Sequence, residues 1–141
     1  MGGEYAALAK CAGRLFTCAQ SKRADDACSP KATAGCTKDL AKIAAARLKV
    51  GAAIAKKCAP PLLGYELLRQ PAAANLDALT SECLLAGVPA LTSLEAYTAC
   101  LVQQHDCRTA SLLGFAMPRA QPLIEALTPA PPFAFPTSCP P

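Results

Sequence analysis

The sequence contains no tryptophan and only one histidine, and aromatic residues make up only 5% of its 141 residues. Hydrophobic residues nevertheless account for 52% of the chain. Much of this share is alanine, which favours helices but buries little surface per residue. Because helices of this kind gain little from burial, cross-links would stabilise them. The nine cysteines of the chain are candidates for such cross-links.

A dense basic patch with neighbouring aromatic residues is also missing, although the net charge is +4. Such a patch is typical of nucleic-acid binding, so we expect no nucleic-acid partner. No apolar run approaches the ~18–20 residues that are needed to span a bilayer. We therefore expect the protein not to cross a membrane, so that any contact it makes with one is peripheral.

The N-terminal stretch MGGEYAALAKC lacks a charged region followed by a long apolar region, and it lacks an arginine-rich transit pattern. We therefore expect no secretory leader, although the chain is rich in cysteine, as secreted proteins are. Either a leader has been removed, or the protein reaches an oxidising compartment by another route.

The hydrophobic pattern predicts helices and no strands. Apolar residues recur at three- and four-residue steps, and alternation with a period of two is absent. We expect helices over residues 4–23, 33–58, 62–69, 72–86, 92–114 and 118–127. The predicted fold class is all-α, with four to six helices arranged as disulfide-stapled hairpins.

Three signals set the predicted boundaries. Pro30 and small polar residues predict a turn over residues 24–35. Thr92 and Glu95 have the spacing of a capping box that opens a helix. Residues 128–141 are rich in proline and are expected to be extended, since such a segment cannot be helical. The chain should thus comprise a cysteine-rich helical domain over 1–127 and an extended tail over 128–141.

The stretch CLVQQHDCR, residues 100–108, brings together residue types that can bind a metal ion. On a helix, Cys100 and Cys107 lie within about 20° of each other and about 10 Å apart, whereas His105 turns about 140° away from Cys100. Metal ligands must converge within about 2–2.3 Å of one ion, and no C-x-x-C motif is present. We expect no catalytic residue, metal or cofactor here, and interpret His105 as a packing or rim residue. A role as a ligand or as an acid–base group stays open.

The cysteines are therefore interpreted as structural. Cys139, in the proline-rich tail, is the predicted odd thiol, either free or bonded to another chain. One possible pairing is a ladder in which two cysteines of the 4–23 helix bond to two of the 92–114 helix. The alternative is bonding between near neighbours, for example Cys28 with Cys36. The predicted disulfide-forming residues are Cys11, Cys18, Cys28, Cys36, Cys58, Cys83, Cys100 and Cys107.

Charged residues of the 33–58 helix are candidate partner contacts. Arg47 lies on the apolar side, where either its stem packs and its head reaches water, or it forms an ion pair with a carboxylate of another helix or a partner subunit. Four lysines lie on the opposite face, which is either solvated or in contact with anionic lipid or an acidic partner. These lysines are Lys38, Lys42, Lys49 and Lys56.

Two segments resemble a known family. LFTCAQSKRADDACSPKATAGC contains Cys18-x9-Cys28 with an aromatic residue shortly before the first cysteine, and AKKCAPPLLGYELL places a cysteine, a proline and a tyrosine in a helical run. Together they resemble the coiled-coil-helix–coiled-coil-helix proteins of the mitochondrial intermembrane space. That family carries paired C-x9-C motifs on antiparallel helices, whereas only Cys18 and Cys28 have this spacing here.

The resemblance implies disulfides acquired by oxidative import into the intermembrane space. It also implies a non-catalytic accessory subunit of a respiratory-chain complex, such as complex I, whose partners are the other subunits of a large membrane-associated assembly. Two other hypotheses stay open. One is a secreted helical module that binds a lipid or another hydrophobic ligand. The other is a thiol redox enzyme, which the absence of C-x-x-C disfavours.

Overall fold

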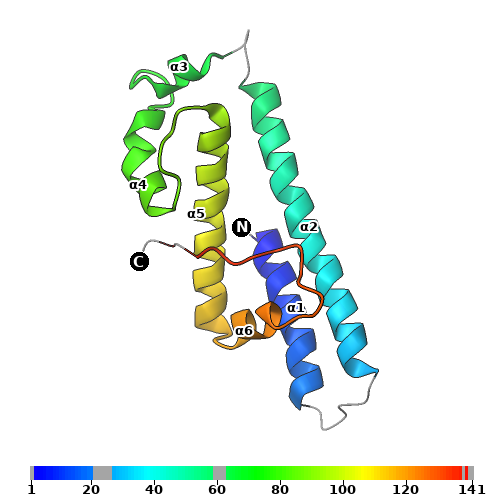
Figure 1. Cartoon of the computed structure of the whole chain (residues 1–141). Coiled ribbons are helices and arrows are strands. Elements are labelled where there is room, and N and C mark those ends of the chain that lie inside the picture. The colour runs from blue at the N-terminus through cyan, green and yellow to red at the C-terminus, as the bar shows by residue number, and fades with distance from the viewer. Residues whose placement is uncertain (1, 21–26, 59–62, 138, 140–141) are drawn as a thin grey trace. The chain divides into compact units, whose positions relative to one another are not determined.

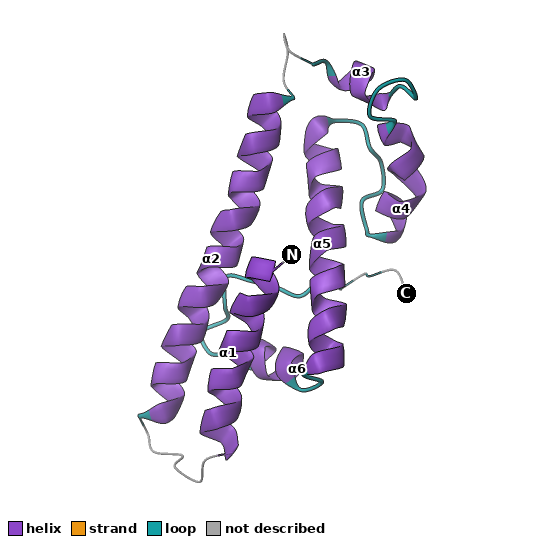
Figure 2. Ribbon diagram, turned by 180° about the vertical axis from the view of Figure 1, so that it is seen from behind, coloured by secondary structure: helices purple, strands orange, loops and turns teal. Residues whose placement is uncertain are grey.

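The computed structural model describes residues 2–20, 27–58, 63–137 and 139. Within these ranges the chain is helical and contains no strand, so the predicted all-α fold is confirmed (Figures 1 and 2). The elements are α1 (Gly2–Gln20), α2 (Cys28–Lys57), α3 (Tyr65–Arg69), a 3-10 helix η1 (Leu76–Leu79), α4 (Thr80–Leu85), α5 (Leu94–Ala116) and α6 (Ala120–Glu125).

The chain divides into two compact units. Unit 1 consists of the described residues of 1–46 and 108–135, and unit 2 of those of 47–107 and 136–141. The division falls within α2 and α5, so each of these helices contributes one part to each unit. It does not follow the predicted boundary at residue 127, because residues 128–135 belong to unit 1.

The core of unit 1 is built from α1, the first half of α2, the end of α5, and α6. Leu8, Cys11 and Ala12 share one face of α1, because residues three and four apart are neighbours on a helix surface. They are fully buried, as is Leu40 of α2. The other buried members of this cluster are Cys36, Ile43, Leu113, Ala120, Ile124, Leu127, Phe133 and Phe135.

Two members of that core come from the segment predicted to be an extended tail. The rings of Phe133 and Phe135 meet edge to face, with their centroids 5.1 Å apart. Both residues are buried. Burying two aromatic side chains is among the larger apolar contributions available to a chain so poor in aromatic residues. This segment therefore packs against its own unit.

Helix α2 begins at Cys28, five residues before the predicted start. Pro30 was interpreted as a turn residue, but it lies in the first turn of the helix. A proline is tolerated there because the backbone N–H that it lacks would have no partner within the helix. The predicted turn therefore shrinks, and its residues 24–26 lie outside the described residues.

Other predicted boundaries also shift. Helix α1 covers 2–20, and the predicted residues 21–23 lie outside the described part of the chain, as does Leu62 at the start of the next predicted helix. The single helix predicted over 72–86 is replaced by turns, η1 and α4, because Asn75 adopts a left-handed conformation with φ 51°. Asparagine tolerates this conformation better than most residues, and one such residue interrupts a helix.

Helices α5 and α6 also differ at their ends from the prediction. Ser93 caps α5 in place of Thr92, since its hydroxyl accepts a hydrogen bond from the backbone N–H of Ala96 at 3.2 Å. Helix α5 continues past Gly114 to Ala116, and α6 is limited to residues 120–125.

Unit 2 has a smaller core. Its fully buried members are Cys83 of α4 and Cys100 of α5, with Leu91 of the connecting loop beside them. The partly buried apolar residues around them are Leu79, Val88, Ala96 and Tyr97. Because this core is so small, we expect the cross-links of unit 2 to contribute much of its stability.

The structure pairs eight of the nine cysteines, and every disulfide lies within one unit. In unit 1, Cys11 bonds to Cys36 and Cys18 to Cys28, with Cα atoms 4.4 and 5.8 Å apart. Because the earlier cysteine of α1 bonds to the later cysteine of α2, the two pairs are nested and the helices are antiparallel. The second helix of the hairpin thus supplies the partners of both α1 cysteines.

In unit 2, Cys83 bonds to Cys100 and Cys107 to Cys139, both with Cα atoms 5.3 Å apart. The predicted ladder between α1 and α5 is therefore wrong. The alternative example, Cys28 with Cys36, is also wrong. Both lie on α2, eight residues or about 12 Å of helical rise apart.

The choice of the odd cysteine was also wrong. Cys139 is bonded, and Cys58, which was expected to form a disulfide, is the free cysteine. The proline content of residues 128–141 predicts a tail that is separate from the helical domain. Phe133 and Phe135, shortly before Cys139, nevertheless pack into the core of unit 1.

Replacing both Cys11 and Cys36 by alanine should lower the free energy of unfolding by about 3 kcal/mol, because the unfolded chain regains the freedom of the closed loop. Urea denaturation followed by circular dichroism measures this change. The matched control is Cys58→Ala, which removes a cysteine that forms no bond and should change the stability by less than about 0.5 kcal/mol. Equal losses in the two variants would contradict the structural role of the disulfide.

Candidate functional site

A polar cluster of unit 1 centres on the buried carboxylate of Asp39. Arg14 of α1 donates a hydrogen bond to Asp39 Oδ2 at 2.5 Å, and Lys42, one turn along α2, donates one to Oδ1 at 2.9 Å. The hydrogen bond from Lys42 lowers the pKa of Asp39 most, and Arg14 lowers it further, against the raising effect of burial. The cluster joins α1 to α2 one turn away from the Cys11–Cys36 disulfide.

Gly35 makes room for this cluster. A Cβ atom at position 35 would lie 3.0 Å from Arg14 Nη1 and 3.3 Å from its Cζ. The absence of a side chain therefore lets the guanidinium lie against the α2 backbone on its way to Asp39.

In unit 2, Arg47 and Asp106 form an ion pair between α2 and α5. Arg47 Nη2 lies 2.8 Å from Asp106 Oδ2, and the two side chains are 26% and 6% exposed. Of the two alternatives for Arg47, the structure thus shows the ion pair with a carboxylate of another helix.

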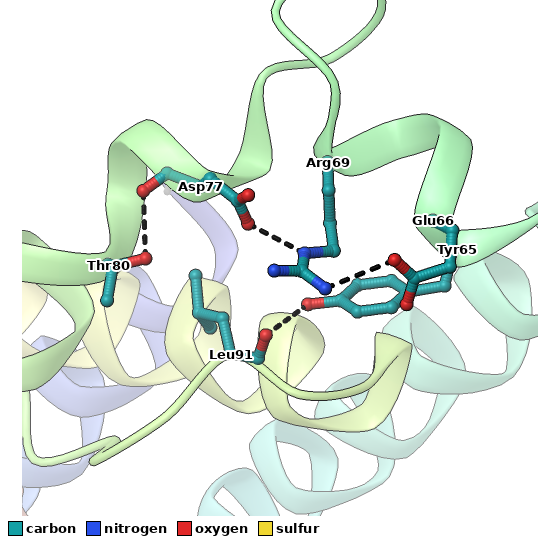
Figure 3. Close-up of polar contacts among 6 residues, drawn as sticks. All are labelled: Tyr65, Glu66, Arg69, Asp77, Thr80 and Leu91. Atoms are coloured by element: carbon teal, nitrogen blue, oxygen red, sulfur yellow. Dashed lines mark hydrogen bonds and ion pairs between the residues drawn. The ribbon is translucent and has the colours of Figure 1, made fainter.

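A second polar cluster of unit 2 surrounds Arg69 of α3 (Figure 3). Arg69 donates hydrogen bonds to Asp77 at 2.8 Å and to Glu66 at 3.1 Å. The hydroxyl of Tyr65 donates to the backbone carbonyl oxygen of Leu91 at 2.7 Å. These contacts tie α3 to the η1 helix and to the loop before α5.

Two members of this cluster have raised pKa values. Burial raises the pKa of Tyr65, and the hydrogen bond to Asp77 raises the pKa of Arg69. Both shifts hold the protons more firmly, whereas a general acid or base needs a pKa close to the working pH. We therefore interpret the cluster as a positioning device for α3.

The CLVQQHDCR stretch lies on α5, and its reactive residues are committed to cross-links. Cys100 bonds to Cys83, Cys107 bonds to Cys139, and Asp106 pairs with Arg47. His105 is half-buried beside them. Across the described ranges, no group of three or more His, Cys, Asp and Glu side chains is arranged to hold a metal ion.

The lysines predicted as partner contacts lie where the helical periodicity placed them. Lys38, Lys49 and Lys56 are exposed on α2. Lys42 also reaches solvent, with 65% of its side chain exposed, although its amino group contacts Asp39. Contact with a partner remains a prediction for all four.

Cys58 follows the last residue of α2 and is half-buried. Its backbone N–H donates to the carbonyl oxygen of Ile54 at 2.8 Å, which continues the helical pattern by one residue. The sequence carries no signal that distinguishes this cysteine from the other eight, because bonding depends on which cysteines the tertiary fold brings together.

Fold and site define an all-α protein whose two units are each closed by two disulfides, and this composition fits an oxidising compartment. None of the helices in the described ranges has both the length and the apolar character needed to cross a membrane. Comparison with protein-family models, with curated proteins and with solved structures finds no match.

Replacing Asp39 by asparagine should lower the free energy of unfolding by about 1–3 kcal/mol at pH 7, because Arg14 and Lys42 lose their charged acceptor. The pKa of Asp39 is lower in the folded state than in the unfolded state. Its carboxylate therefore stabilises the fold at pH values above the unfolded pKa of about 3.9. This stabilisation is lost as the pH falls through the folded-state pKa. The stability difference between wild type and Asp39→Asn, measured by urea denaturation, should thus shrink below pH ~4.

The control for this comparison is Asp77→Asn, which removes a carboxylate that is 52% exposed. It should cost less than about 1 kcal/mol, as exposed ion pairs usually do. The role of Asp39 would be contradicted if Asp77→Asn lowered the free energy of unfolding as much as Asp39→Asn does. It would also be contradicted if the stability difference between wild type and Asp39→Asn did not depend on pH.

Alkylation of the native protein with iodoacetamide should modify one cysteine, Cys58, because the other eight are bonded. Peptide mass spectrometry identifies the site. After reduction and denaturation, all nine cysteines should react. Modification of Cys139 in the native protein would show that the Cys107–Cys139 bond is absent.

Proposed function

We propose that this protein is a non-catalytic structural subunit that braces a larger membrane-associated assembly in an oxidising compartment. The observation that carries the proposal is the position of the cysteines. Eight of nine are bonded within their own unit, and Cys11, Cys36, Cys83 and Cys100 are at most 1% exposed. Sulfur atoms placed in this way fill the core and cross-link the helices.

The proposal takes its specific form from the coiled-coil-helix–coiled-coil-helix resemblance. That form is an accessory subunit on the intermembrane-space side of a mitochondrial respiratory-chain complex, with complex I the first choice. The nested disulfides of the α1–α2 hairpin support it, because paired motifs on antiparallel helices are joined in the same way. The spacings within each helix are C-x6-C and C-x7-C, so the two disulfides lie about two helical turns apart.

Unit 2 does not repeat this arrangement. Its two disulfides join α5 once to α4 and once to Cys139, and Cys58 forms no bond. The support for the family resemblance therefore rests on unit 1 alone.

The cysteines in this structure offer one free thiol and no free pair. A thiol oxidoreductase exchanges a disulfide through an accessible thiol with a partner thiol nearby. All nine cysteines lie in the described part of the chain, and eight are bonded, so Cys58 has no free partner within the chain.

Native mass spectrometry of the protein from its source tests the proposal. Extraction without reductant, with thiols blocked at lysis, should recover it within a large membrane-derived assembly, with four intramolecular disulfides and a blocked Cys58. A free, monomeric protein would contradict the structural-subunit proposal. A free protein with an additional lipid-sized mass would instead support the alternative, a secreted module that binds a hydrophobic ligand.

A further inference from the structure

The C-terminal end of α5 presents two large apolar side chains to solvent. Phe115 is 92% exposed and Leu112 is 55% exposed. Leu113, by contrast, is 1% exposed and lies in the core of unit 1, with Met117 packed against the same core. Leu113 and Phe115 are about 200° apart around the helix. The inward side chains therefore hold the helix in a register that directs Phe115 outward.

The described part of the chain leaves this surface uncovered. A Cβ atom added at Gly114 would meet nothing within 4 Å. Ser111 and Ala116, which flank the apolar pair on α5, are exposed as well. A phenylalanine held in this way contributes little to the stability of its own fold, and exposed apolar groups of this kind mark interaction surfaces when they gather with suitable neighbours.

Along the chain, the charged residues nearest to the apolar pair are both arginines. Arg108 lies one helical turn before Leu112 on the same face, and Arg119 follows four residues after Phe115; both arginines are exposed. No acidic residue occurs between positions 107 and 124. We call Arg108, Leu112, Phe115 and Arg119 the α5-tip patch.

We propose that the α5-tip patch docks on an anionic lipid surface. Phe115 and Leu112 would enter the boundary between headgroups and acyl chains, and the two arginines would contact lipid phosphates. Aromatic and leucine side chains next to arginine are the combination that binds membrane interfaces. Arginine can extend its stem along the apolar region while its guanidinium stays among the headgroups. The inference rests on the membrane-associated role proposed above and adds the site of contact.

The size and shape of the patch favour lipid over a protein partner. A stable protein interface buries about 800 Å² on each partner, whereas this patch offers two large apolar side chains at one helix end. A single projecting phenylalanine would need a matching pocket on a protein, but a bilayer surface admits it without one. The absence of acidic residues in the segment complements the negative charge of anionic lipids.

The first test places a fluorescent reporter at the patch. The chain contains no tryptophan, so Phe115→Trp introduces the sole indole. Its emission should shift to shorter wavelength when vesicles of phosphatidylcholine and phosphatidylserine are added to the disulfide-intact full chain. The matched control is Leu84→Trp, at a 58% exposed position of α4, which should show no shift.

The second test measures binding by vesicle flotation. The variant with Leu112→Ser and Phe115→Ser should lose about tenfold or more in affinity for the anionic vesicles, because it loses both apolar contacts. The control with Leu84→Ser and Leu85→Ser removes two comparably exposed leucines and should bind like wild type. Arg108→Gln and Arg119→Gln should each weaken binding about fivefold. A variant is folded when its circular dichroism spectrum matches that of wild type and when alkylation modifies Cys58 and no other cysteine.

Three results would overturn the inference. The first is that wild type binds no anionic vesicles, and the second is that the patch variant and the leucine control lose equal affinity for them. The third is that wild type self-associates and the patch variant does not. The last would assign the patch to a second copy of the chain. A protein that ignores vesicles but is recovered in a large assembly overturns this inference alone. A protein that binds vesicles through the patch but is always recovered free overturns the structural-subunit proposal and leaves the patch in place.

Discussion

In unit 1, the disulfide between Cys11 and Cys36 holds α1 and α2 with their Cα atoms 4.4 Å apart, and the rest of the unit is arranged around this close approach. Leu8 and Leu40 are buried beside it. Arg14 reaches across to Asp39 and passes close to Gly35, where a Cβ atom would lie 3.0 Å from the guanidinium. A chain with much alanine and few aromatic residues gains limited free energy from burial, so a covalent bond in the core adds stability by limiting the unfolded ensemble.

Each unit carries two disulfides of its own, so the stability of both units depends on whether the surroundings are oxidising or reducing. The bonds of unit 1 join the two helices of a hairpin, and those of unit 2 join α5 to α4 and to Cys139. Because the buried apolar cluster of unit 2 is small, reduction should loosen this unit more than any single truncation in its core. A protein that is cross-linked in this way fits an oxidising compartment.

The polar residues that looked most reactive in the sequence are used to hold helices together. Asp106 is paired with Arg47, and the two cysteines around it are in disulfides. The structural-subunit proposal rests on the bonded cysteines, and the lysines of α2 and the α5-tip patch are the surfaces proposed for contact with partners.

Local patterns in the sequence determined the all-α class, the approximate positions of the helices and the exposed lysine face, because helical periodicity is a property of neighbouring residues. They also excluded convergence of His105 and the two nearby cysteines on one metal ion. The disulfide partners, the free Cys58, the burial of Phe133 and Phe135 and the exposure of Phe115 were decided by the tertiary structure alone. Each depends on which segments, distant along the chain, come together, and spacing along a helix cannot distinguish between partners that lie on different helices.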